Sequence, residues 1–112
     1  MSTENERRME RERQIVRKCI RILVAGGWFP TFVFDGEEYV KVTGETAAMS
    51  AVTAVDESTI TFSKMGRRNH GVKIILGNGN DVISDYNCGD EEFNSLMDAV
   101  NEYTNSLSEI NL

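Results

Sequence analysis

The sequence has few of the residues that mark several large classes of protein. It contains two cysteines, Cys19 and Cys88, and neither lies in a CxxC motif or a Cys/His cluster, which excludes a disulfide scaffold. No apolar run approaches the roughly 20 residues that span a bilayer. Residues 1–13 are almost all polar, where a signal peptide would need an apolar stretch. We therefore expect a cytoplasmic protein without membrane contact.

Signatures of catalysis and of metal binding are also missing. The single histidine, His70, has no cysteine or carboxylate close in sequence with which to hold zinc. No serine or cysteine lies in a nucleophile elbow. The segment 77–81 lacks the Lys-Ser/Thr of a phosphate-binding loop and the ligand spacing of an EF-hand, so a hairpin turn explains it better. We predict a non-enzymatic protein with no cofactor and no metal.

Length and hydrophobic periodicity predict one domain with a helix near each end. The 112 residues, 40% of them hydrophobic, suit a single core, so we expect one domain over 1–112, with 1–5 disordered. Ile15, Cys19 and Ile22 recur at three- and four-residue spacing, which predicts a helix over 4–24. A second apolar stripe predicts a helix over 90–107.

Between these helices, short β-branched and aromatic runs separated by turn residues predict an antiparallel meander. We expect six strands, over 28–34, 37–43, 47–55, 59–64, 70–76 and 81–85. The predicted fold class is α+β, with a single antiparallel meander sheet of five or six strands and the N- and C-terminal helices packed on one face.

The aromatic residues of the first strand have more than one interpretation. Trp28, Phe29, Phe32 and Phe34 are more typical of a core than of a platform on which bases stack. Two helices nevertheless cover only one face of such a sheet, so some of these residues, or Tyr39, would lie on an exposed patch. A homodimer through the sheet or its edge strand is therefore favoured over a monomer.

Charge is unevenly distributed along the chain, whose formal net charge is -6. Residues 1–21 hold seven basic and four acidic residues, a net of +3, whereas residues 22–112 hold five and fourteen, a net of -9. After Lys73 the remaining 39 residues contain eight acids and no Lys or Arg. A field of one sign repels nucleic acid and attracts basic partners. A surface kept acidic for solubility is the alternative.

The acids of this last region are the candidate partner-binding residues. The polar side of the predicted helix 90–107 and its C-terminal flank has no basic residue and carries Glu91, Asp98, Glu102 and Glu109. Asp98 and Glu102, four residues apart, repel each other by about 0.2–0.5 kcal/mol. One lysine would remove this cost, so the pattern indicates a selected acidic face, with Asp81 and Asp85 as extensions.

Two basic clusters support a competing interpretation. Arg7, Arg11, Lys18 and Arg21 share one stripe of the first predicted helix, and a predicted hairpin loop holds Lys64, Arg67, Arg68 and His70. Either cluster suits a phosphate backbone, and the hairpin also suits an acidic partner. Glutamates interleaved with the helix arginines favour a solvated face, and the acidic balance of residues 22–112 disfavours nucleic acid.

The stretch Val72 to Tyr86, which contains GNGNDVISDY, together with the acidic helix after it, resembles small uncharacterised proteins encoded by bacteriophages and plasmids. The resemblance covers about the last third of the chain and implies a helix, a meander sheet and a helix, with no catalytic residue. Proteins of this kind, such as anti-CRISPR and anti-restriction proteins, often bind and inhibit a host defence machine. Several of their families are acidic because they imitate the phosphate backbone.

We therefore expect an interaction protein that binds and inhibits a basic, nucleic-acid-handling protein in the host cytoplasm, without direct contact to nucleic acid. One alternative is an accessory protein that binds nucleic acid with the first helix and the 64–73 hairpin. Another is a virion or assembly component that forms a homo-oligomer through the uncovered face of the sheet.

Overall fold

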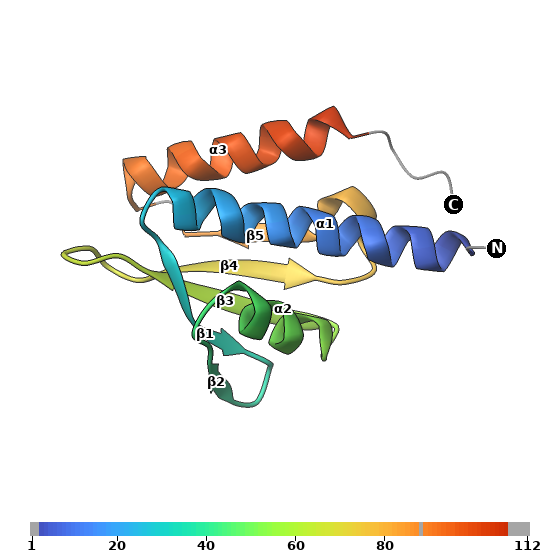
Figure 1. The fold of residues 1–112 in the computed structure, drawn as a ribbon, viewed down its shortest axis with the longest axis horizontal. Coiled ribbons are helices and arrows are strands. Elements are labelled where there is room, and N and C mark those ends of the chain that lie inside the picture. The colour runs from blue at the N-terminus through green and yellow to red at the C-terminus, as the bar shows by residue number, and fades with distance from the viewer. Residues whose placement is uncertain (1–2, 88, 108–112) are drawn as a thin grey trace.

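The computed structural model describes residues 3–87 and 89–107 and has three helices and a five-stranded sheet in these ranges (Figure 1). The elements follow in the order α1 (Glu4–Ala25), β1 (Phe29–Phe34), β2 (Tyr39–Lys41), α2 (Glu45–Thr53), β3 (Glu57–Ser63), β4 (His70–Ile75), the 3-10 turn η1 (Gly79–Asp81), β5 (Ile83–Tyr86) and α3 (Glu91–Ser106). The fold class is α+β, as the sequence predicts.

The sheet is antiparallel throughout, with the strand order β2-β1-β3-β4-β5. Its inner face is apolar, since Val33, Ile60 and Val72 lie in register on neighbouring strands and are fully buried. Figure 1 shows α1 and α3 running side by side in opposite directions, and α2 next to β1 and β3. All three helices thus belong to the layer that covers the inner face.

The expected strand over 47–55 is wrong, because this segment forms α2. Its buried residues Ala48, Met49 and Val52 follow the spacing of one helical face, and Ala47, Ala48 and Ala51 have the highest helix propensity of any residue type. The β-branched residues of the segment suggested a strand, but alanine-rich packing against α1 decides the outcome. The sheet therefore has five strands in the described ranges.

The first helix begins at Glu4, where the sequence predicts it. The Thr3 hydroxyl accepts a hydrogen bond from the Glu6 backbone N–H at 3.1 Å, and Glu4 and Glu6 occupy the positive end of the helix dipole. Residues 3–5, expected to be disordered, thus form the capped first turn of α1.

A buried carboxylate connects α1 to the turn between β4 and β5. Glu12 is 1% exposed, and its Oε2 accepts hydrogen bonds from the backbone N–H groups of Gly77 at 2.9 Å and Gly79 at 2.7 Å. Gly77 and Gly79 have φ values of 99° and 63°, which a side chain would strain. The two glycines give the turn the shape of a small anion-binding nest, and the protein's own carboxylate fills it.

The outer face of the sheet has no helix over it in the described ranges. Phe29 is 54% exposed and Phe32 38%, and Tyr39 at the edge is 70% exposed. The expectation that the aromatic residues of this segment belong to the core is thus correct for Trp28, which is fully buried, and wrong for Phe29 and Phe32.

The Glu12 contact predicts a large difference between two neighbouring glutamates. Glu12→Ala leaves two backbone donors without their acceptor, so we expect it to lower the free energy of unfolding by about 2–4 kcal/mol. Glu10→Ala, at an exposed position of the same helix, should change it by no more than about 0.5 kcal/mol. Urea unfolding of both variants measures the difference, and equal effects would contradict the structural role of Glu12.

Candidate functional site

The candidate site is the outward face of α3. The Asp90 carboxylate caps the helix by accepting a hydrogen bond from the Phe93 backbone N–H at 3.0 Å. Phe93, Met97 and Val100 are buried and fix the inward side. The opposite side carries the exposed residues Glu91, Ser95, Asp98, Asn101, Glu102 and Asn105. We call Glu91, Asp98 and Glu102 the α3 acidic face.

The carboxylates of the α3 acidic face have no cationic partner. In the part of the chain that the structure describes, Glu91, Asp98 and Glu102 take part in no ion pair. A helix rises 1.5 Å per residue, so the three carboxylates lie about 10 Å and about 6 Å apart along the axis. The face therefore presents three unneutralised charges over about 16 Å.

The other predicted acids do not extend this face. Asp85 is exposed on β5, where it pairs in register with Lys73. Lys73 alternates with the buried Val72 and Ile74, so Asp85 belongs to the outer face of the sheet, away from α3. Asp81 is exposed in η1, which packs against α1. Glu109 lies outside the described residues.

Most of the basic side chains of the hairpin, which the sequence predicts to bind an anion, instead form contacts within the protein. Lys64 Nζ donates to the Gly26 carbonyl oxygen at 3.1 Å and pairs with Glu92 Oε1. Arg67 donates to Asp90 Oδ2 at 2.7 Å and reaches Glu92 Oε2 at 3.5 Å. These groups form a cluster around the N-terminus of α3, which we call the helix-end cluster.

The two remaining residues of the hairpin differ in exposure. His70 is 5% exposed and lies between Trp28 and Phe93, with ring centroids 5.2 and 4.7 Å away. Its Nδ1 is 2.8 Å from the Arg68 carbonyl oxygen. Among the four residues predicted to contact a phosphate or an acidic partner, Arg68 alone has a side chain that is exposed and forms no ion pair with another described residue.

The basic stripe of α1 is also dispersed. Arg21 donates to both carboxylate oxygens of Glu45, at 2.6 and 3.2 Å, and this contact lowers the pKa of Glu45. Lys18 Nζ lies 5.4 Å from the centre of the Tyr103 ring, and Arg11 also has a partner. Arg7 lies about 21 Å from Arg21 along the helix axis. Arg11, Lys18 and Arg21 thus each have a partner within the protein.

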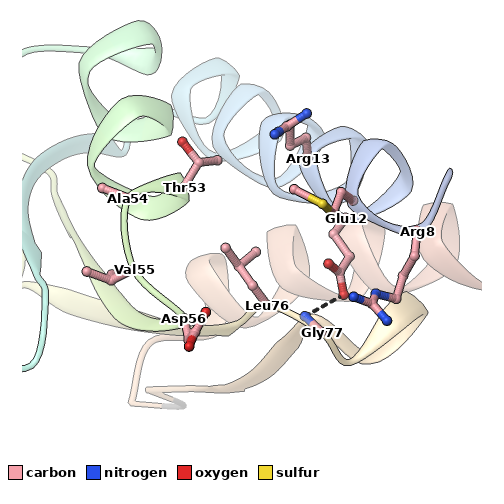
Figure 2. Close-up of a pocket in the computed structure, with 10 residues that line it drawn as sticks. Arg8, Glu12, Arg13, Thr53, Ala54, Val55, Asp56, Leu76 and Gly77 are labelled. Carbon is pink, nitrogen blue, oxygen red and sulfur yellow. Dashed lines mark hydrogen bonds between the residues drawn. The ribbon is translucent and has the colours of Figure 1, made fainter. Parts of the chain in front are cut away.

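A pocket of about 240 Å³ lies between α1, the end of α2 and the end of β4, and Figure 2 shows the residues that line it. Charged groups of both signs line it, among them Arg13 and Asp56. The Glu12 carboxylate at its edge is already bonded to the glycine turn. None of the ten lining residues is a cysteine, histidine or serine.

Cys19 is fully buried, which raises the pKa of its thiol to about 12 and keeps it protonated. Within 3–87 and 89–107, no three His, Cys, Asp or Glu residues are placed to hold a metal ion. Cys88 lies outside these ranges.

The sequence did not identify Glu12 or Glu92 as important. A signal for Glu12 was present, because it lies three and seven residues before Ile15 and Cys19 and so falls on the apolar stripe of α1. The role of Glu92 depends on how the hairpin meets α3, and local spacing carries no information about that contact.

In comparisons with known proteins, no family model, curated protein or solved structure matches the chain. The resemblance to phage and plasmid proteins stays a prediction. Over the described residues, no helix combines the length and the apolar character needed to cross a membrane.

The helix-end cluster predicts a pH-dependent contribution to stability. Lys64 holds the pKa of Glu92 below its ordinary value of 4.5, so the contribution is present above pH 4.5 and is lost as the pH falls through the folded-state pKa. Lys64→Met should be less stable than the wild type near neutral pH, and the gap should narrow in acid. Arg68→Met is the control without an ion pair. Urea unfolding across pH measures both, and a gap independent of pH would contradict the assignment.

Proposed function

We propose that the chain is a non-enzymatic binding protein whose α3 acidic face holds a basic surface of another protein, one that handles nucleic acid. The observation that supports this proposal is the distribution of ion pairs. Lys64, Arg67 and Arg21 neutralise Glu92, Asp90 and Glu45, while the α3 acidic face keeps its charge. Exposed carboxylates of one sign accelerate encounter with a basic partner.

The spacing of the α3 acidic face indicates the size of the partner's contact. Three charges over about 16 Å have a mean spacing of about 8 Å, whereas one strand of duplex DNA carries about one charge per 3.4 Å. The face is thus a partial imitation of a phosphate backbone. It suits a short basic segment, such as one face of a helix or one loop, better than a whole nucleic-acid groove.

Inhibition follows from this geometry if the basic segment is one that the partner uses for nucleic acid. The α3 acidic face and a phosphate strand would then compete for the same lysines and arginines. This part of the proposal draws its support from the resemblance to phage and plasmid proteins. The dispersal of the α1 cations and the occupied hairpin favour it over direct binding of nucleic acid.

Charge reversal on α3 tests the proposal with a matched control. Asp98→Lys/Glu102→Lys removes two charges of the face, and Glu6→Lys/Glu10→Lys makes the same change at the same four-residue spacing on the exposed side of α1. Asp98→Lys and Glu102→Lys should each change stability by no more than about 0.5 kcal/mol, and Glu6→Lys, at the positive end of the α1 dipole, should lower it by up to about 1 kcal/mol. In capture from a soluble extract of the source cells, a basic protein should be retained by the wild type and the α1 variant and lost with the α3 variant.

Mass spectrometry of the captured material gives the result. Equal capture by all three proteins would show that another surface holds the partner. Capture of nucleic acid alone, lost when Arg67 and Arg68 are replaced with alanine, would favour the accessory-protein alternative instead.

A further inference from the structure

The edge strand β2 has free backbone hydrogen-bonding groups. The Asp35 N–H donates to the Glu38 carbonyl and the Val42 N–H donates to the Thr31 carbonyl, each at 3.0 Å. Bonded and non-bonded residue pairs alternate along an antiparallel ladder. Val40, which pairs with Val33, therefore directs its backbone groups towards β1. The N–H and C=O groups of Tyr39 and Lys41 point to the open edge.

The side chains of β2 are also uncovered on both faces of the sheet. Tyr39 is 70% exposed on the outer face, and Val40 is 38% exposed on the inner face, beyond the cover of the helices. Figure 1 shows β2 at one rim of the molecule, with α3 towards the other. A further strand beside β2 would complete the backbone bonds and cover both side chains.

We propose that this strand is β2 of a second copy of the chain, paired antiparallel about a twofold axis at Val40. Tyr39 of each copy then lies opposite Lys41 of the other, and these are the residues whose backbone groups point to the edge. Val40 meets Val40 on the inner face, where directly opposed Cβ atoms are about 5 Å apart. The two sheets join into one continuous sheet of ten strands.

The length of β2 selects this register among the alternatives. With the twofold axis at Val40, all three residues of β2 lie opposite residues of β2 in the other copy. A shift of two residues in one direction places Lys41 against Lys41, and the opposite shift places Lys41 against Glu37, which lies in the bend before β2. A lysine on an edge strand ordinarily discourages pairing, but here each Lys41 faces the ring of a tyrosine, which attracts a cation.

The opposite edge of the sheet is less suited to self-pairing. β5 carries Asp85, and Asp81 lies just before it, with no basic residue in the strand. An antiparallel pair of β5 strands would thus gain no contact between opposite charges. The charge of the two edges therefore favours β2.

Amide exchange distinguishes this dimer from one formed through the outer face. The interface is small, so the dimer should be weak and depend on concentration. In dilute solution the Tyr39 and Lys41 amides should exchange rapidly, and they should become protected as sedimentation shows dimer. The Val40 amide, already directed towards β1, serves as the internal control. Dimer without protection of Tyr39 and Lys41 would overturn the proposal, as would monomer at every concentration up to millimolar.

Variants give a second, independent readout. Lys41→Pro removes a donor on the open side of the edge strand, where proline is tolerated, and should raise the dimer dissociation constant at least about tenfold. Lys41→Glu, which loses the attraction between the lysine and the tyrosine ring, should do the same. Arg68→Glu, an equal charge change on the exposed hairpin, is the control.

The proposed dimer and the proposed role of the α3 acidic face can be tested separately. Asp98→Lys/Glu102→Lys should leave the dissociation constant of the dimer unchanged, because α3 lies away from the β2 edge. Unchanged affinity in both Lys41 variants would show that the copies do not meet at β2.

Discussion

The position of α3 depends on the meeting of two helix ends of opposite polarity. The C-terminal end of α1 carries partial negative charge and the N-terminal end of α3 partial positive charge. Lys64 bonds the Gly26 carbonyl at the first end and pairs with Glu92 at the second, so each charged group sits at the helix end that it stabilises. The Glu92 carboxylate also accepts the Trp28 indole N–H at 3.2 Å, which connects the cluster to the core.

The ion pairs of this junction, together with the pair between Arg21 and Glu45, determine which acidic side chains stay without a basic partner. Lys64, Arg67 and Arg21 are held by acids of other elements, and the chain has no basic residue after Lys73. The outward carboxylates of α3 are therefore left without internal neutralisation. In the N-terminal half of α1, Glu12 holds the glycine turn before β5. Both halves of α1 are thus connected to the sheet layer by charged groups, and the α3 acidic face takes no part in these contacts.

Much of this fold could be predicted from local pattern, and the remainder depends on contacts distant in sequence. The 3.6-residue periodicity located α1 and α3 to within one or two residues, and turn residues separated the strands. Alanine-rich α2 was mistaken for a strand because the β-branched residues within it outweighed helix propensity. The hairpin cations looked free in sequence, since their acids lie 23–28 residues away in α3. The α3 acidic face could be predicted, because helical spacing alone places its residues on one side of the helix.

The association rate of the captured partner as a function of salt tests the central claim most directly. If the α3 acidic face steers a basic surface, the rate for the wild type should fall steeply as the ionic strength rises, because exposed charges are screened. The Asp98→Lys/Glu102→Lys variant should associate more slowly at low salt and lose most of this dependence. An association rate that is the same for both proteins and insensitive to salt would contradict the account.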